Sequence, residues 1–422
     1  MVRTLFVVSA DLPNGPVHDA RGPLKDYVAV ARRLGADVLD RTCVDRTPRA
    51  QPIARMLGQA PAQAWLAAAR RYHYDVLLAD GEHIGLPLAL LLQRMGVRMP
   101  LVMIGHRLST RKKLPFFRIA KVQTHISRVV VHSSYQRDFA IDSLGFRSDQ
   151  LALLPYQVDT RFWQPTSTRE ESLIVSAGLE YRDYPTLYAA VSGLHVRVVI
   201  GAASHWSRRP SSARDSSRPP NVEVGSFDYQ RLRALYAQAA LVVVPLEDVD
   251  FQAGVTTILE AMAMGKAVIV TRTRGQTDVA NDRRAEVRGV TPAWARRASL
   301  LGELEARAGI AIEPNSFYVP PKDPHALRRA IIYLLEHPEE RACLGAAGRQ
   351  LVERLLTVEH FADRVAHVVG QAARRRRRAA RRARTPCELG VPAMAQSPAI
   401  PERPSLSLRP LSLRPGCSGP RS

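Results

Sequence analysis

The stretch LVVVPLEDVDFQAGVTTILEAMAMGKAVIVTRTRGQTDV, residues 241–279, decides the fold class of this chain. A strand-length apolar run, 241–246, ends in a polar loop. A glycine-led turn at Gly254 then opens a helical pattern, and the apolar run AVIVT follows directly. Apolar strands that alternate with helices are typical of a parallel sheet buried on both faces. The stretch therefore predicts a strand–helix–strand unit of an α/β domain.

The same alternation covers most of the chain, in two series. The apolar runs are 5–10, 75–80, 100–106 and 128–133, and then 173–178, 196–202, 241–246 and 267–271. We predict two doubly wound, Rossmann-like α/β domains over residues 1–165 and 166–352. A helix at 353–371 is expected to pack back towards the first domain. The Arg-, Pro- and Ser-rich segment 372–422 has the composition of a disordered tail.

The overall composition favours a soluble globular enzyme. Of the 422 residues, 46% are hydrophobic, and no apolar run approaches the roughly 18 residues that span a bilayer. The opening MVRTLFVVSADLP is interpreted as a first buried strand and not as a signal peptide. The four cysteines lie far apart, which predicts neither a disulfide framework nor a zinc site. We expect a cytoplasmic protein, with peripheral contact at the inner face of the membrane as an open alternative.

The net charge of +21 is concentrated at one end of the chain. Residues 371–422 hold 12 Arg and two Glu, about half of the excess. This tail is either an electrostatic tether to anionic lipid or a solvated, dispensable segment. Nucleic acid is not an expected partner, because no aromatic residues alternate with the arginines. The basic and aromatic segment 109–117, STRKKLPFF, is either a solvated loop or a membrane contact.

The helix opened by Gly254 is a candidate anion site. It starts after a strand end, so the amides of Gly254, Val255 and Thr256 and the positive end of the helix dipole would meet an anion such as a diphosphate. Glu260 lies one to two turns further along the same helix. A carboxylate at this position can accept hydrogen bonds from two ribose hydroxyls.

The stretch 241–279 resembles the donor-site signature of glycosyltransferase family 4, in which two glutamates are separated by seven residues before an A-M-A-x-G-K strand entry. Here Gln252 is followed by seven residues, Glu260 and then AMAMGKAVIV. Other segments resemble the family in the expected order. They are 154–165, LPYQVDTRFWQP; 176–191, SAGLEYRDYPTLYAAV; and 318–354, which begins YVPPKDPHALRRA. In the first half, 100–106 and 129–139 carry a weaker likeness.

The resemblance implies a GT-B fold, with two Rossmann-like domains that face a cleft. The implied activity moves a sugar from a nucleoside diphosphate sugar to an acceptor hydroxyl, with retention of the anomeric configuration and without a metal or other cofactor. The acceptor would be a glycan, a lipid-linked molecule or a small molecule, as in glycan biosynthesis.

The resemblance also implies roles for individual residues. Arg182, beside Gly178, would neutralise the diphosphate, and Gly254 and Val255 would offer it their amides. Glu260 would hold the ribose. Gln252 would take the place of the first glutamate, near the sugar, where its amide lacks the charge that stabilises an oxocarbenium-like transition state.

Three residues are candidates for the acceptor side. His106 ends the run 100–106 and so lies at the carboxyl edge of the first sheet. It either contacts the sugar, acts as a base on the acceptor hydroxyl, or is satisfied by a nearby backbone group. Asp80 and Glu82 follow the preceding strand and are candidates to contact the acceptor.

Two alternative functions remain open. A metal site is not expected. An epimerase or hydrolase of the same fold would need a carboxylate acid and base, which Gln252 does not favour. Alternatively, the tail itself would drive binding to nucleic acid or to an anionic membrane. The triplet Asp248–Asp250 superficially matches a metal-binding Asp-x-Asp, but so short a pattern often arises by chance.

Overall fold

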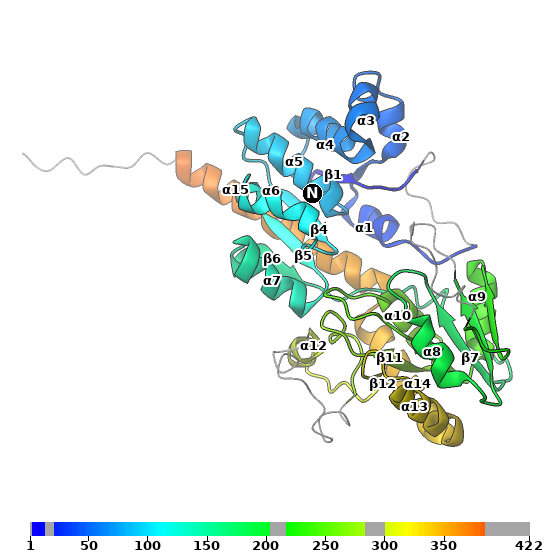
Figure 1. The fold of residues 1–422 in the computed structure, drawn as a ribbon. Helices are drawn as coiled ribbons and strands as arrows, with labels where there is room; N and C mark the ends of the chain where they lie inside the picture. The colour runs from blue at the N-terminus through cyan, green and yellow to red at the C-terminus, as the bar shows by residue number, and fades with distance from the viewer. Residues whose placement is uncertain (1, 13–20, 203–216, 283–299, 385–422) are drawn as a thin grey trace, which may run out of the picture. The chain divides into compact units, whose positions relative to one another are not determined.

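The structure is a computed structural model that describes residues 2–12, 21–202, 217–282 and 300–384. Its compact unit, Met1–Ala379, contains two six-stranded parallel sheets with helices packed against them (Figure 1). Their strand orders are β2-β1-β3-β4-β5-β6 and β12-β11-β10-β7-β8-β9. The predicted pair of doubly wound α/β domains is therefore confirmed. We call them the N-terminal lobe and the C-terminal lobe.

The N-terminal lobe holds the first sheet. Its strands are β1 Thr4–Val7, β2 Asp37–Leu39, β3 Val76–Ala79, β4 Leu101–Gly105, β5 Arg128–Val131 and β6 Leu151–Leu153. Its helices are α1 Asp26–Leu34, α2 Arg41–Asp45, α3 Gln51–Leu57, α4 Gln59–Arg70, α5 Glu82–Arg94, α6 Leu114–Arg118 and α7 Ser134–Leu144. Short 3-10 turns are η1 Arg71–His73, η2 Arg111–Lys113, η3 Val122–His125 and η4 Ser148–Gln150.

The C-terminal lobe holds the second sheet. Its strands are β7 Leu173–Ala177, β8 Arg197–Gly201, β9 Val222–Gly225, β10 Leu241–Val244, β11 Ala267–Thr271 and β12 Ser316–Val319. Its helices are α8 Tyr184–Val191, α9 Tyr229–Gln238, α10 Val255–Ala263, α12 Leu300–Ala308, α13 Pro324–Glu336 and α14 Pro338–Leu355. The strand–helix–strand unit predicted from residues 241–279 is β10–α10–β11, and the pairing of Leu241 with Ala267 sets its register.

The central strands are apolar because both faces of each sheet are covered. All residues of β3, β4 and β10 are buried, and their side chains belong to clusters that extend into the covering helices. A fully buried Val or Leu side chain contributes roughly 1.5–3 kcal/mol. In parallel sheets the loops at the carboxyl edge are then left to bind ligands.

The chain passes between the lobes twice, and the two passages are hydrogen-bonded to each other. Val158 donates its amide to the carbonyl of Leu356 at 2.9 Å, and Val358 donates to the carbonyl of Val158 at 3.1 Å. Helix α15, Val358–Arg384, then buries Phe361 and Val365 in a cluster with Phe6 and other residues of the first sheet. The last helix therefore belongs to the core of the N-terminal lobe.

Helix α15 extends beyond residue 371, where the sequence analysis placed the start of a disordered tail. Alanine and arginine both favour helix, so the AARRRRRAARRAR segment continues the regular structure through Arg384. The rest of the expected tail, 385–422, lies outside the described residues, as does 13–20 in the loop after β1. Within the described ranges, no helix is long and apolar enough to cross a membrane.

Candidate functional site

Gly254 sits at a sharp turn that brings helix α10 to the carboxyl edge of the second sheet. Its φ of 75° lies in the left-handed region. A Cβ at this position would lie 2.7 Å from Cγ1 of Val244 and 3.1 Å from Cδ2 of Leu246. Only glycine therefore allows the chain to leave β10 and enter α10 this closely.

The N-terminus of α10 is built to meet a negative charge. Its cap residue, Gly254, has no side chain to accept from the first-turn amides. Val255 is buried and Thr256 is exposed, so the turn has one face against the core and one towards solvent. The aligned peptide dipoles add a partial positive charge at the same point. The geometry is that of an anion site at a helix start.

Arg182 lies beside this turn, 5% exposed. Its Nε donates to the carbonyl of Ala177 at 2.9 Å, one Nη donates to the carbonyl of Glu180 at 2.9 Å, and the other Nη donates to Oγ1 of Thr257 at 3.2 Å. Burial lowers the pKa of Arg182, yet an arginine stays charged at neutral pH. The guanidinium therefore fixes a full positive charge next to the helix start.

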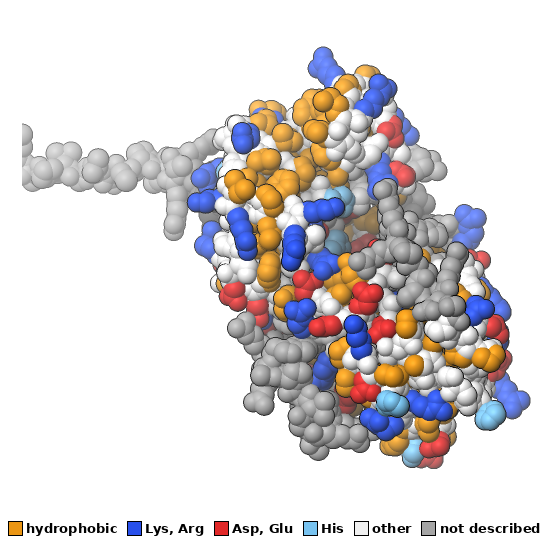
Figure 2. All heavy atoms as spheres, in the orientation of Figure 1, with side chains coloured by type: hydrophobic (Ala, Val, Ile, Leu, Met, Phe, Trp, Pro, Cys, Tyr) orange, Lys and Arg blue, Asp and Glu red, His pale blue; other side chains and the backbone are white. Residues whose placement is uncertain are grey.

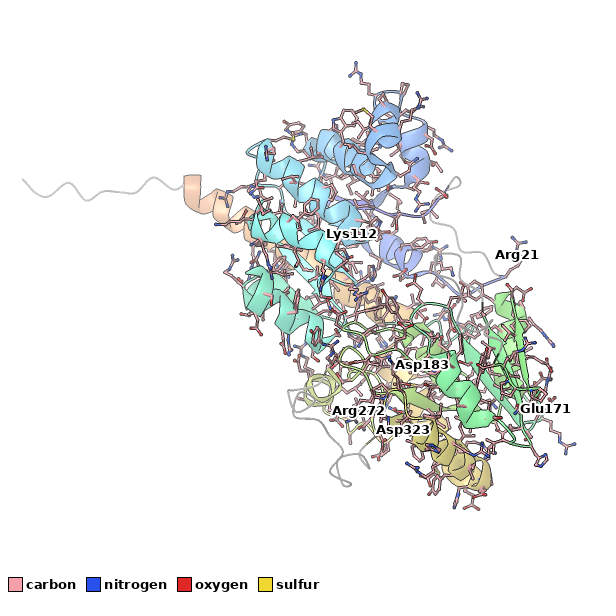
Figure 3. The ribbon with its side chains drawn as sticks, in the orientation of Figure 1. Arg21, Lys112, Glu171, Asp183, Arg272 and Asp323 are labelled. Carbon is pink, nitrogen blue, oxygen red and sulfur yellow. The ribbon has the colours of Figure 1, made fainter. Side chains whose placement is uncertain are left out.

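The turn that carries Arg182 is tightly constrained. Gly178 has a φ of 101°, and a Cβ there would collide with the guanidinium of Arg182. Tyr181 has a φ of 55°, which is uncommon for a bulky residue. Asp183, labelled in Figure 3, ends the turn by capping α8, where its carboxylate accepts from the Thr186 amide at 3.2 Å. One glycine and a strained backbone thus hold the arginine in place.

Glu260 lies further along α10 on the same side. The Tyr236 hydroxyl donates to its Oε2 at 3.4 Å. Burial raises the pKa of Glu260 to about 8, although Lys25, the Tyr236 hydrogen bond and Arg182 all act to lower it. The carboxyl group is therefore largely protonated at neutral pH until additional hydrogen-bond donors reach it.

Gln252 is buried, and the residues that the structure describes give its side chain no hydrogen-bond partner. It is 6% exposed, and neither Oε1 nor Nε2 has a partner among the described residues. Buried amides are almost always hydrogen-bonded, because leaving one unpaired costs about 1–3 kcal/mol. An empty donor and an empty acceptor at this point are what a polyhydroxylated ligand would satisfy.

His106 directly follows β4, which ends one residue earlier than predicted, and both of its ring nitrogens are hydrogen-bonded. Nε2 lies 2.9 Å from the carbonyl of Asp80, which can only accept, so Nε2 carries the hydrogen. Nδ1 lies 3.0 Å from the Tyr156 hydroxyl and accepts from it. The side chain is exposed but oriented. To act as a base, Nδ1 of His106 would first have to give up its hydrogen bond from Tyr156 and accept one from the acceptor hydroxyl instead.

Asp80 has a buried carboxylate oxygen without a hydrogen-bond partner in the described part of the chain. Its Oδ2 accepts from the Ser9 amide at 2.6 Å and the Ser9 hydroxyl at 2.8 Å, but Oδ1 has none among the described residues. Burial raises the pKa of Asp80, while the Ser9 bonds and the charges of His83 and His106 oppose the rise. Asp80 is therefore a held carboxyl group with one buried oxygen that is unpaired among the described residues.

Glu82 points into the protein. The sequence analysis placed it at a strand end, whereas it lies in the first turn of α5 and is 3% exposed. It accepts from the Arg107 amide at 2.6 Å and pairs with Lys113 at 3.2 Å. Burial acts to raise the pKa of Glu82, but Lys113 and His106 outweigh it, so the net shift is downward. Glu82 orders the loop after β4 instead of presenting its carboxylate to a ligand.

The structure brings together residues that were not predicted from the sequence to lie near the site. Arg107 pairs with Asp250 at 2.9 Å and donates to the Tyr181 hydroxyl at 2.8 Å, which joins the two lobes. Gln136 donates to the carbonyl of Asp250 at 2.7 Å. A basic residue directly after a strand-end histidine was the available signal for Arg107. Nothing in the sequence pairs it with Asp250.

Asp278 makes a second connection between the lobes. It is fully buried, and its carboxylate accepts from the amide of Ser134 at 2.8 Å and the hydroxyl at 3.0 Å, at the start of α7. It also accepts from the Leu300 amide at 2.9 Å, at the start of α12. One carboxylate thus bridges two helix N-termini. Burial raises the pKa of Asp278 against these hydrogen bonds.

Both aspartates of the triplet Asp248–Asp250 are ion-paired with arginines. Asp248 pairs with Arg274 at 3.5 Å, and Asp250 pairs with Arg107. Over the described part of the chain, no group of three His, Cys, Asp or Glu side chains is arranged to hold a metal ion.

A family model matches part of the C-terminal lobe. Residues 183–301 match the family model described as "Glycosyl transferases group 1". The match includes α10 with Gln252, Gly254 and Glu260, and it begins one residue after Arg182. No curated protein sequence matches the chain.

Solved structures match the whole two-lobe arrangement. Sucrose-phosphate synthase (tll1590) from Thermosynechococcus elongatus is 17% identical over 89% of this chain and 100% of its own, with a TM-score of 0.61. Anabaena Alr3699/HepE in complex with UDP and glucose is 15% identical over 88% and 100%, with a TM-score of 0.60. A UDP-forming α,α-trehalose-phosphate synthase from Burkholderia vietnamiensis is 13% identical over 88% and 98%, with a TM-score of 0.55. The shared fold is GT-B.

Proposed function

We propose that this chain, a glycosyltransferase of GT-B fold whose residues 183–301 carry the group 1 domain, moves a sugar from a nucleoside diphosphate sugar to an acceptor hydroxyl with retention of the anomeric configuration. It would do so in the cytoplasm and without a metal ion. The observation that carries the proposal is the buried charge of Arg182, held beside the glycine-led start of α10.

This arrangement suits a diphosphate with a ribose attached. Arg182 and the amides of Gly254, Val255 and Thr256 would neutralise the phosphates, since a fixed cation and a helix start stabilise the same anion. Glu260, beyond the first turn of the helix, would accept from the ribose hydroxyls. Gln252 would meet hydroxyls of the transferred sugar with its unpaired amide.

The transfer itself needs little covalent help from the protein. The bond between the anomeric carbon and the diphosphate oxygen breaks, and the acceptor oxygen bonds to the same face of that carbon. The acceptor proton passes to an oxygen of the leaving diphosphate. Asp80, through its unpaired Oδ1, would orient the acceptor hydroxyl, and His106 would hold the Asp80 backbone. Because Gln252 cannot exchange a proton, an epimerase or hydrolase is the weaker candidate.

A nucleotide panel tests the donor. Thermal melting of the full chain with UDP, GDP, ADP or TDP and their sugar conjugates should single out one base. The UDP complex of the HepE structure makes uridine the first to try. A ligand at about 100 times its Kd adds about 2.7 kcal/mol of apparent stability. No shift with any nucleotide would remove the proposed donor site.

The product tests the stereochemistry. NMR of the glycoside formed from the selected donor should show the donor's anomeric configuration. An inverted product would leave glycosyl transfer standing but contradict transfer on one face.

The raised pKa of Glu260 predicts a pH-dependent affinity. Ribose hydroxyls donate to the ionised carboxylate, so binding favours the deprotonated form. Affinity for the phosphate-free nucleoside should rise about tenfold between roughly pH 6.5 and 8.5 and then level off. Isothermal titration calorimetry with the nucleoside measures this, and the choice of nucleoside avoids titration of the phosphate. Glu260→Gln should bind more weakly, by about 1.5–3 kcal/mol, without the pH dependence. A wild-type profile in the variant would exclude Glu260 as its source.

A further inference from the structure

The segment from His83 to Arg137 contains no acidic residue. It holds ten basic ones, Arg94, Arg98, Arg107, Arg111, Lys112, Lys113, Arg118, Lys121, Arg128 and Arg137. In a chain that is 23% charged, so long a run of one sign produces a locally positive surface wherever its side chains reach solvent.

Several of these cations reach solvent together, around η2, α6 and η3. Arg111, Lys112, Arg118 and Lys121 are exposed, and none has an ion-pair partner among the described residues. Lys112 is labelled in Figure 3. By contrast, Lys113 is turned inward, where it pairs with Glu82. The exposed cations are thus available to something outside the chain.

An aliphatic side chain stands in the middle of these cations. Ile119 is 81% exposed, between Arg118 and Lys121, although large hydrophobic residues are usually buried. Met95, at the end of α5, is 45% exposed. Figure 2 shows hydrophobic side chains gathered with Lys and Arg side chains over this part of the N-terminal lobe. We call Arg111, Lys112, Arg118, Ile119 and Lys121 the basic–apolar surface.

The basic end of α15 lies close to this surface. Arg375 pairs with Asp149 of η4 at 3.1 Å. The neighbouring Gln150 donates to the carbonyls of Gln123 at 3.0 Å and Ile126 at 2.8 Å, which ties η4 to η3. Arg374 and Arg375 are both exposed. Two basic segments far apart in the sequence therefore meet at one end of the N-terminal lobe.

We propose that the basic–apolar surface docks this chain on an anionic membrane, with Ile119 inserted at the headgroup boundary and the surrounding cations on lipid phosphates. Exposed cations attract an anionic leaflet, and an aliphatic side chain among them adds apolar area that only an acyl boundary would bury. Single-stranded nucleic acid would call for exposed aromatic side chains, whereas Phe117 of this segment is buried and Phe116 is half-buried against the core.

The surface is continuous with the proposed acceptor side. Lys113 ends η2, donates to the carbonyl of Arg107 at 2.7 Å and pairs with Glu82, whose carboxylate orders the loop after β4. If the proposed function holds, a docked enzyme would present Asp80 and His106 to an acceptor whose lipid anchor stays in the membrane. The acceptor class indicated is therefore a lipid-linked hydroxyl.

Vesicle flotation tests the docking without any turnover, so its failure is distinct from a failure of the proposed function. The full chain should float with phosphatidylcholine vesicles that contain about 30 mol% phosphatidylglycerol and should remain unbound with phosphatidylcholine alone. The variant Lys112→Gln/Arg118→Gln/Lys121→Gln should lower the partition coefficient about a hundredfold, at about fivefold per charge.

Matched variants distinguish the effect of the basic–apolar surface on partitioning from the effect of the chain's net charge. Arg169→Gln/Arg329→Gln/Arg354→Gln removes three exposed charges from the C-terminal lobe and should leave partitioning within about twofold of wild type. Ile119→Ser should lower partitioning about tenfold, whereas Met56→Ser, at 82% exposure on α3, should not.

Three outcomes would overturn the proposal. The first is equal losses in the two triple variants, which would leave net charge as the cause. The second is wild-type partitioning of the first triple variant, which would leave the binding to other parts of the chain. The third is flotation unaffected by Ile119→Ser together with tight binding of single-stranded RNA that the first triple variant abolishes, which would assign the surface to nucleic acid.

Discussion

Replacing Arg182 with alanine is expected to lower kcat about 10²- to 10³-fold, the loss seen when one preorganised donor is removed from a developing transition-state charge. The leaving diphosphate gains negative charge as the sugar departs, and Arg182 is the buried cation that lies beside the start of α10. Nucleoside diphosphate should lose far more affinity than the phosphate-free nucleoside. Steady-state kinetics and calorimetry with both ligands measure the two effects.

The buried position of Arg182 requires a control for folding. Its guanidinium also bonds the carbonyls of Ala177 and Glu180, so the alanine variant loses structure as well as charge. Arg182→Lys keeps the charge without the planar fork and should recover part of the diphosphate affinity. Arg329→Ala, exposed on α13, should change neither property. Equal losses for nucleoside and nucleoside diphosphate would show that Arg182 has no phosphate role.

The fold was predictable because its strands are nearly uniform in polarity. A run such as Leu241–Val244 has no polar face, which only a sheet covered on both sides accommodates. Residues 41–70 escaped prediction, since α2, α3 and α4 are short or rich in alanine and lack a clear apolar stripe. Helix α5 starts at Glu82 and continues through Pro87, although a proline is typical of a helix's first turn and not of its interior.

The start of α5 at Glu82 explains why this carboxylate points inward. At a strand end its carboxylate would face the edge of the sheet, whereas in the first turn of α5 it is directed towards Lys113 and the Arg107 amide. Side-chain direction changes with secondary structure, so a small error in a boundary turns a candidate ligand contact into an internal one. Asp80, two residues earlier, stayed at the edge of the sheet.

The arrangement of Gly254 and Glu260 was more predictable than the contacts between lobes. Gly254 starts the helix that carries Glu260, so their spacing in the sequence already places them one to two turns apart on one element. The pair Arg107–Asp250 spans the two lobes, as does the bridge from Ser134 to Asp278. Such contacts depend on how two separately folded sheets meet, which local periodicity does not encode. The strained φ of Tyr181 was hidden for the same reason.

Gly254→Ala is expected to destabilise the protein by about 2–5 kcal/mol. A left-handed φ costs a residue with a Cβ roughly 1–2 kcal/mol, and overpacking adds typically 1–3 kcal/mol. The added methyl would lie 2.7 Å from Cγ1 of Val244, on a central strand that cannot retreat. Chemical denaturation measures the loss.

Gly193→Ala separates the two contributions. Gly193 has a similar φ of 71°, but no atom lies within 4 Å of a Cβ there, so its variant should show only the backbone cost. The difference in destabilisation between the two variants measures the cost of the collision. Relief of that collision must move the start of α10, and a displacement of about 1 Å lowers kcat/KM on the order of a hundredfold. Normal kinetics in Gly254→Ala, with a stability loss no larger than that of Gly193→Ala, would mean that the tight turn does not place the helix amides for the reaction.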